Sequence, residues 1–227
     1  KKNKDYLSMK TLKELTWEHH KEAERQGFVK ILMSGKIHPE VYANYLFNQH
    51  QCYNILEPLA MAEGLLDKFP FIRRAPAIKA DFDELWTYAH QPMMMESTRK
   101  YVEYANKELM DCPEKIMAHI YVRHMGDLSG GQMIKRKVPG LGKYYEFKFN
   151  KNPEHGITYK DTNEIKEALR LAVDSHYVYN DASDKDKNVN NVVYEARQCF
   201  GFATDLFKEM LQFIKNNEKR FGDGTTK

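Results

Sequence analysis

The stretch AHIYVRHMGDLSGGQMI, residues 118–134, decides the fold class, because its apolar residues recur at helical spacing on both sides of three glycines. Glycine inside a helix costs about 0.5–1 kcal/mol relative to alanine, so Gly126, Gly130 and Gly131 weaken this helix by a few kcal/mol. Two explanations could offset that cost. The glycines could let a flat ligand approach the bare backbone next to Asp127, or they could let two helices cross closely. The sequence alone favours neither explanation.

The rest of the chain is also predicted to be helical. The 227 residues include only 12 glycines and 8 prolines, which cluster, and helix formers with a 3.6-residue period fill the intervals. We therefore expect an all-α, single-domain multi-helix bundle over residues 1–221, followed by a flexible tail at residues 222–227. The expected helices are residues 7–26, 29–34, 39–66, 78–86, 97–111, 113–137, 161–179 and 187–221. Residues 139–155 are expected to form a long, aromatic-rich surface loop.

Composition narrows the class of protein. The net charge of +3 is mild and interleaved along the chain, which does not indicate a nucleic-acid partner. The mean hydropathy is −0.70, no apolar run is long enough to span a membrane, and no secretory signal follows the charged N-terminus. Cys52, Cys112 and Cys199 are widely spaced, which argues against disulfides and structural zinc. We expect a soluble, cytoplasmic protein with no nucleic-acid and no membrane partner.

Several motifs of other protein classes fail on inspection. Gly126 and Gly131 have the spacing of a phosphate-binding loop, but Gln132 stands where that loop needs lysine. Gly140 and Gly142 lack the third glycine of a dinucleotide fingerprint. None of the nine histidines has a carboxylate three residues upstream, as di-iron bundles require, and HExxH is absent. These failures exclude a phosphate loop, a dinucleotide site, a di-iron centre and a helical zinc protease.

The first expected helix carries a second candidate site at His20. We expect His20 to lie one step round from the stripe of the helix that faces the core, on the side that also carries Lys13, Trp17 and Glu24. A histidine in such surroundings could be an axial metal ligand oriented by the carboxylate. The alternative is a surface or half-buried histidine in a charged helix. The stripe that is expected to face the core consists of Leu12, Leu15, His19 and Ala23.

Taken together, the two segments resemble a known family. Residues 13–24 (KELTWEHHKEAE) and 121–132 (YVRHMGDLSGGQ) resemble the proximal and distal helices of haem oxygenases, and the second run is the family's most specific signature. Further similarity at residues 166–170, 195–200 and 206–207 extends the resemblance over about residues 7–215. It implies a bundle with haem b, both substrate and cofactor, between the first helix and a glycine-kinked distal helix. The implied reaction uses O₂ and electrons from an external donor to give biliverdin, expected as the IXα isomer, with CO and ferrous iron.

The resemblance also implies roles for individual residues. His20, rather than His19, would be the axial ligand of the haem iron, with Glu24 beside it. Gly126 and Gly130 would lie over the distal face of the haem, and Asp127 would hold the water network that delivers protons, satisfied by water or by a donor such as Arg123. The residues that match propionate contacts are Lys13, Tyr121, Lys166 and Arg170. Those that match the distal hydrogen-bonded and packing shell are Tyr53, Arg123, Phe200 and Phe207.

The chain departs from the family pattern at one position and leaves two other functions open. His124 stands where animal relatives have tyrosine, so a second iron ligand stays possible at this stage. The chain lacks the hydrophobic C-terminal tail of the animal enzymes and resembles the soluble bacterial and cyanobacterial ones. This resemblance implies a monomer that takes electrons from ferredoxin. In a photosynthetic organism its product would supply phycobilin synthesis. A haem carrier on the same scaffold is the main alternative, although a carrier has no use for Asp127 and its glycines. A thiamin-degrading enzyme is the third, but the cysteines lack the expected carboxylate setting.

Overall fold

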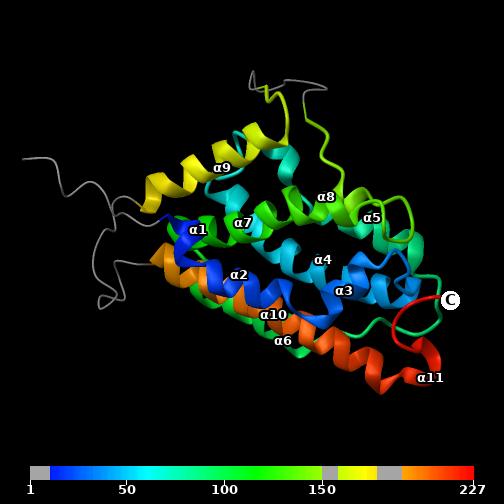
Figure 1. Ribbon diagram of the computed structural model, residues 1–227. Coiled ribbons are helices and arrows are strands. Elements are labelled where there is room, and N and C mark those ends of the chain that lie inside the picture. Colours follow the sequence, from blue (N-terminus) through cyan, green and yellow to red (C-terminus); the bar gives the residue numbers. More distant parts are fainter. Residues whose placement is uncertain (1–10, 150–157, 178–190) are drawn as a thin grey trace, which may run out of the picture.

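The computed structural model describes residues 11–149, 158–177 and 191–227, and these residues fold into packed helices (Figure 1). The all-α prediction is confirmed. Among the helices of the described ranges, none combines the length and the apolar character needed to cross a bilayer. The α-helices are α1 (Leu12–Leu15), α2 (Trp17–Glu24), α3 (Gly27–Met33), α4 (Pro39–Ala62), α5 (Ala75–Leu85), α6 (Glu96–Tyr104), α7 (Pro113–Leu128), α8 (Gly130–Ile134), α9 (Thr162–Tyr177), α10 (Asn191–Asn216) and α11 (Glu218–Phe221). Shorter turns are η1 (Pro70–Ile72), the π-helical η2 (Ala105–Leu109) and η3 (Lys143–Tyr145).

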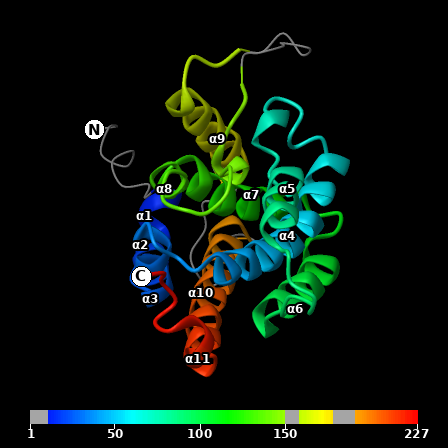
Figure 2. The same cartoon turned by 90° about the vertical axis from the view of Figure 1, so that its right-hand side faces the viewer.

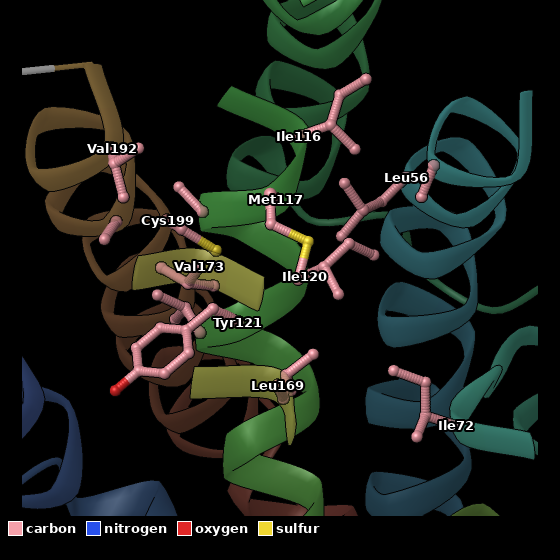
Figure 3. Packing of buried hydrophobic residues seen from close by; sticks show 14 of the residues in the cluster. Leu56, Ile72, Ile116, Met117, Ile120, Tyr121, Leu169, Val173, Val192 and Cys199 are labelled. Atoms are coloured by element: carbon pink, nitrogen blue, oxygen red, sulfur yellow. The ribbon is translucent and has the colours of Figure 1, made fainter. Parts of the chain in front are cut away.

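Helix α7 lies at the centre of the bundle. It packs against α4, α9 and α10, and α10 also packs against α2 (Figure 2). In Figure 3, side chains from α4, α7, α9 and α10 meet in one apolar cluster. Burial of each such side chain contributes about 1.5–3 kcal/mol, so this cluster fixes the position of α7. Members of the cluster include Leu56, Met117, Ile120, Leu169, Val173 and Cys199.

The first helix is shorter and more broken than the sequence predicts. Thr16 leaves helical geometry (φ −111°, ψ 3°) and its hydroxyl donates to the Leu12 carbonyl at 2.8 Å, so α1 ends at Leu15 and α2 begins at Trp17. The buried stripe runs through Leu12, Thr16 and Ala23, at a spacing that includes half-buried His20 and leaves His19 exposed. The prediction that His19 belongs to the stripe facing the core is therefore wrong. The expected start of this helix, at residue 7, lies outside the described residues.

The glycine-rich helix is interrupted at Ser129. Its backbone (φ −110°, ψ −89°) is not helical, and it separates α7 from α8, so the single helix predicted over residues 113–137 is wrong. Helix α4 ends four residues earlier than expected, at Ala62, and residues 105–109 widen into a π-helix. The expected boundaries at residues 179 and 187 fall outside the described residues.

The last six residues, which the sequence predicts to be a flexible tail, make backbone hydrogen bonds to the segment before α4. The Thr226 N–H donates to the Lys36 carbonyl at 2.6 Å, and the His38 N–H donates to the Gly224 carbonyl at 2.8 Å. Gly224 itself is buried against Ile214. Backbone pairing, rather than apolar side chains, holds the tail, and apolar content alone could not reveal it.

Candidate active site

The proximal side of the site is His20 on α2. Its Nε2 lies 2.6 Å from Glu24 Oε1, one helical turn ahead, and its ring stacks on Phe200 of α10 with centroids 5.6 Å apart. Trp17 packs on the same ring at 5.4 Å. The side chain is 38% exposed, so Glu24 and two aromatic rings orient an imidazole that a ligand can still reach. The second ring nitrogen is the one that could bind a metal.

The distal side is the exposed surface of α7 and α8 around the glycines. A Cβ placed on Gly126 or Gly130 would meet no described atom within 4 Å. A Cβ on Gly131 would lie 2.6 Å from Tyr145 Cδ1. The close neighbour of Gly131 is the Tyr145 ring of η3, so a crossing of two helices does not explain this glycine. Gly131 permits close packing, whereas Gly126 and Gly130 border open space that a flat ligand could fill.

Asp127 is buried just behind this open surface. Its Oδ2 accepts a 2.5 Å hydrogen bond from the Tyr53 hydroxyl of α4, and the Tyr144 hydroxyl lies 3.3 Å from that of Tyr53. Burial raises the pKa of Asp127 to about 6, while the charge of His124 and the hydrogen bonds from Tyr53 and Tyr144 act in the opposite direction. A carboxyl with this pKa can take up and release a proton near neutral pH.

Tyr144 is a site residue that the sequence analysis missed. It lies in the segment predicted as a surface loop, yet it is fully buried and stacks on Tyr145 at 4.1 Å. Asp81 of α5 accepts the backbone N–H groups of Lys143 and Tyr144 at 3.0 and 2.8 Å, and the Arg74 guanidinium donates to the Tyr144 carbonyl at 2.9 Å. The run of aromatic residues in this segment could have indicated burial. The polar residues that hydrogen-bond it, Asp81 and Arg74, are distant in the sequence and could not be identified from it. Residues 150–155 of the predicted loop lie outside the described residues.

Arg123 lies beside this network without bonding to Asp127. Its guanidinium lies over the rings of Tyr101 and Tyr53, at 4.2 and 5.7 Å, while the Arg123 carbonyl accepts from the Tyr53 hydroxyl at 3.3 Å. Arg123 therefore contacts the ring of the tyrosine that bonds Asp127. The suggestion that its guanidinium itself satisfies Asp127 is wrong, because Tyr53 fills that place.

Cations on α9 face the glycine-rich segment. Lys166 Nζ donates to Ser129 Oγ at 3.3 Å, and Arg170 is close enough to Tyr121 to hydrogen-bond its hydroxyl. The structure thus brings Tyr121, Lys166 and Arg170 to one edge of the site. Lys13 is exposed on α1.

Phe207 lies away from His20. It packs on Phe28 and Tyr45, at 6.2 Å from each, in a second apolar cluster. Phe207 is thus a packing residue of α10 on the side of α3 and α4.

His124 is not arranged as an iron ligand. Its Nδ1 lies 3.0 Å from the Ile120 carbonyl and its Nε2 lies 2.9 Å from Glu57 Oε2, and both side chains are completely buried. Both ring nitrogens are therefore already engaged. The open question of a second iron ligand at His124 is answered against it in this structure.

Both the sequence and the overall fold are similar to those of known proteins. A family model described as "Heme oxygenase" matches residues 7–209. The chain belongs to the haem oxygenase family. It is 27% identical to a heme oxygenase of Rhodella violacea over 228 aligned positions, covering 90% of this chain and 87% of that protein. The heme oxygenase of Leptospira interrogans has a similar structure, with a TM-score of 0.70, 28% identity and coverage of 87% and 97% of the two chains. Heme oxygenase-1 of Synechocystis, solved with heme, has a TM-score of 0.71 at 24% identity, with coverage of 92% and 94%.

Proposed function

We propose that this chain cleaves haem oxidatively to biliverdin with His20 as the axial ligand and Asp127 as the group that manages protons. Membership of the haem oxygenase family supports the overall reaction. The observation that carries the residue roles is the position of Asp127, a buried carboxyl with a pKa of about 6, directly behind an exposed surface that Gly126 and Gly130 leave bare.

The residues present fit a haem. His20 lies on α2 and Gly126 on α7, and both helices pack against α10. A flat ring needs an open surface on one face and a nitrogen ligand on the other, and the space at Gly126 together with the exposed imidazole provides them. When bound, haem supplies both the iron that activates O₂ and the ring that is cleaved.

The chain's own side chains then have distinct tasks. The Tyr53 hydroxyl donates to Oδ2 of Asp127 and holds the carboxyl in place, while Tyr144 fixes Tyr53; the Asp127 carboxyl takes up a proton and passes it through water toward the open face. The absence of side chains at Gly126 and Gly130 leaves the ring edge accessible.

Cations at one edge set the orientation of the ring. Lys166 and Arg170, with Tyr121, bind the propionates, and this fixes which ring edge lies under the distal helix and hence which isomer forms. Lys13 adds a further cation from α1. The IXα isomer is the product that we propose for this orientation.

The electron donor is an acidic redox protein of the ferredoxin class. The net charge of +3 suits such a partner, because complementary charge speeds encounter. We further propose that the chain acts as a monomer in the cytoplasm.

One experiment tests the reaction directly. The protein is mixed with haem, ferredoxin with its reductase, and O₂, and the visible spectrum is followed. Loss of the Soret band with rising red absorbance and release of CO is the expected result. A Soret band that persists through turnover conditions would instead identify a haem carrier.

A further inference from the structure

The ion pair between His124 and Glu57 is buried at the centre of the bundle and has no role in the function proposed above. Both side chains are fully buried, on α7 and α4. Burying two ionisable groups costs free energy unless each is fully hydrogen-bonded. The hydrogen-bond partners of the two side chains therefore matter for the stability of the pair.

The hydrogen bonds indicate the charge state of the pair. A carbonyl oxygen can only accept, so the contact with Ile120 requires a hydrogen on Nδ1 of His124. Glu57 Oε2 accepts the Arg74 N–H at 2.6 Å and Oε1 accepts the Ala75 N–H at 2.7 Å, at the start of α5. Two backbone donors and a helix N-terminus favour the carboxylate form of Glu57. His124 then donates from Nε2 as well, which makes it an imidazolium.

This positive charge lies close to the catalytic carboxyl. His124 precedes Asp127 by three residues on α7, so the two side chains lie on the same side of the helix. The ring of Tyr53, whose hydroxyl bonds Asp127, meets the His124 ring edge to face with centroids 5.3 Å apart. Tyr53 therefore contacts both His124 and Asp127.

We propose that the buried His124–Glu57 ion pair is a positioning pair that keeps Asp127 ionisable near neutral pH. Glu57 keeps the imidazolium charged, and the imidazolium stabilises the carboxylate form of Asp127 against burial. The inference rests on the proposed role of Asp127. The charge of His124 is indeed the largest of the effects that lower the pKa of Asp127, and only burial outweighs it.

Other groups also face Asp127, and none of them replaces His124. Tyr53 and Tyr144 donate hydrogen bonds to the network and are not charged at neutral pH, and Arg74 contributes less than His124. The titratable or charged groups around Asp127 are Tyr42, Tyr45 and Tyr53 of α4, Arg74 before α5, Arg123 and His124 of α7, and Tyr144 and Tyr145 of η3.

The test is a carboxyl titration of the haem-free protein, followed by NMR of ¹³C-labelled aspartate and assigned with Asp127→Asn. In His124→Gln the midpoint of Asp127 is expected to rise by roughly one unit, the usual effect of losing a nearby opposite charge. In Glu57→Gln, His124 is expected to lose its imidazolium ¹⁵N signature and Asp127 to titrate higher than in the wild type. A midpoint that stays put or falls in either variant overturns the proposal.

A matched control uses the other buried histidine of α7. His119 is also fully buried and its Nε2 lies 2.9 Å from Glu195, but its partners are Tyr101 and Glu195 rather than the Asp127 network. His119→Gln is expected to leave the Asp127 midpoint unchanged, and an equal shift in that variant counts against a specific role of His124.

Two further readouts keep the proposal falsifiable. If His124→Gln fails to fold, the ¹⁵N spectrum of the wild-type haem-free protein at neutral pH decides, because a His124 ring that carries hydrogen on only one nitrogen overturns the proposal. Haem turnover of Asp127→Ala tests the proposed function separately, so a failure there is distinguishable from a failure of the ion pair.

Discussion

The hydroxyl of Tyr53 donates a 2.5 Å hydrogen bond to Oδ2 of Asp127, although the two residues are 74 positions apart in the chain. It joins the middle of α4 to the last turn of α7 and gives the buried carboxyl a direct donor. Without such a donor, a carboxylate in this position would be strongly disfavoured.

Asp127→Asn is expected to stabilise the haem-free protein at high pH. Burial raises the pKa of Asp127 from 3.8 to about 6, so between those values the native state binds more protons than the unfolded state. Stability is therefore lost as pH rises through this window, by an amount on the order of 2–3 kcal/mol, and the loss is complete above pH 6. Asparagine removes this effect. Urea unfolding of the wild type and of Asp127→Asn at pH 4 and pH 8 checks this prediction. If the variant is no more stable than the wild type at pH 8 than it is at pH 4, the pKa of Asp127 is not raised.

Asp127→Ala is expected to bind haem about as well as the wild type but to lose ring cleavage by roughly 10² or more, the usual effect of removing a proton-delivery group. Reducing equivalents should then appear as peroxide instead of biliverdin. The measurement is single-turnover spectroscopy with a peroxide assay. Wild-type biliverdin formation in this variant would rule out the proposed role.

His20→Ala is expected to lose the native spectrum of the haem complex and most turnover, because Glu24 and Phe200 orient the imidazole of this residue. Added imidazole should restore part of both. His19→Ala is the matched control, since its side chain is exposed one residue earlier. If His19→Ala gives the loss and His20→Ala is silent, the assignment of the axial ligand is wrong.

Lys166→Ala combined with Arg170→Ala is expected to change the isomer of biliverdin more than the affinity for haem. Each partly exposed charge pair contributes only about 0–1 kcal/mol to binding, but together they fix the rotation of the ring. Chromatography of the products reads this out. A double variant that still forms one unchanged isomer speaks against the propionate contacts.

Alanine substitutions can distinguish a glycine that is needed for packing from a glycine that leaves room for a ligand. Gly131→Ala should destabilise the haem-free protein by about 1–3 kcal/mol, because its Cβ would meet Tyr145. Gly126→Ala should leave stability unchanged or raise it by about 0.5–1 kcal/mol, since its Cβ meets no described atom, while it impairs haem turnover. Thermal unfolding and turnover together check both. Equal destabilisation by the two changes would contradict the assignment.

The sequence predicts the helices and the signature residues but not the groups that surround them. Periodicity identifies α4, α7 and α10, and the spacing of His20 to Glu24 follows directly from helix geometry. The break at Thr16 could not be predicted, because a threonine hydroxyl that bonds its own helix is compatible with either outcome.

Tyr144 and the His124–Glu57 pair escaped prediction for a different reason. Their positions depend on hydrogen bonds between segments more than 60 residues apart, such as those of Asp81 with the backbone of residues 143 and 144. Local patterns carry no information on such partners. The sequence therefore does not predict the buried hydrogen-bond network around Asp127.

Because the backbone is not helical at Ser129, the side-chain amide of Gln132 helps to hold α8 in position relative to α7. Gln132 of α8 donates from Nε2 to the Asp127 carbonyl at 3.1 Å and to the Tyr145 carbonyl at 2.9 Å. The angle between α7 and α8 is thus set by a turn that follows α8 in the chain and that α5 anchors. An insertion or deletion in residues 136–142 would therefore affect Gly130, because the Gln132 hydrogen bonds tie the end of η3 and the end of α7 to α8.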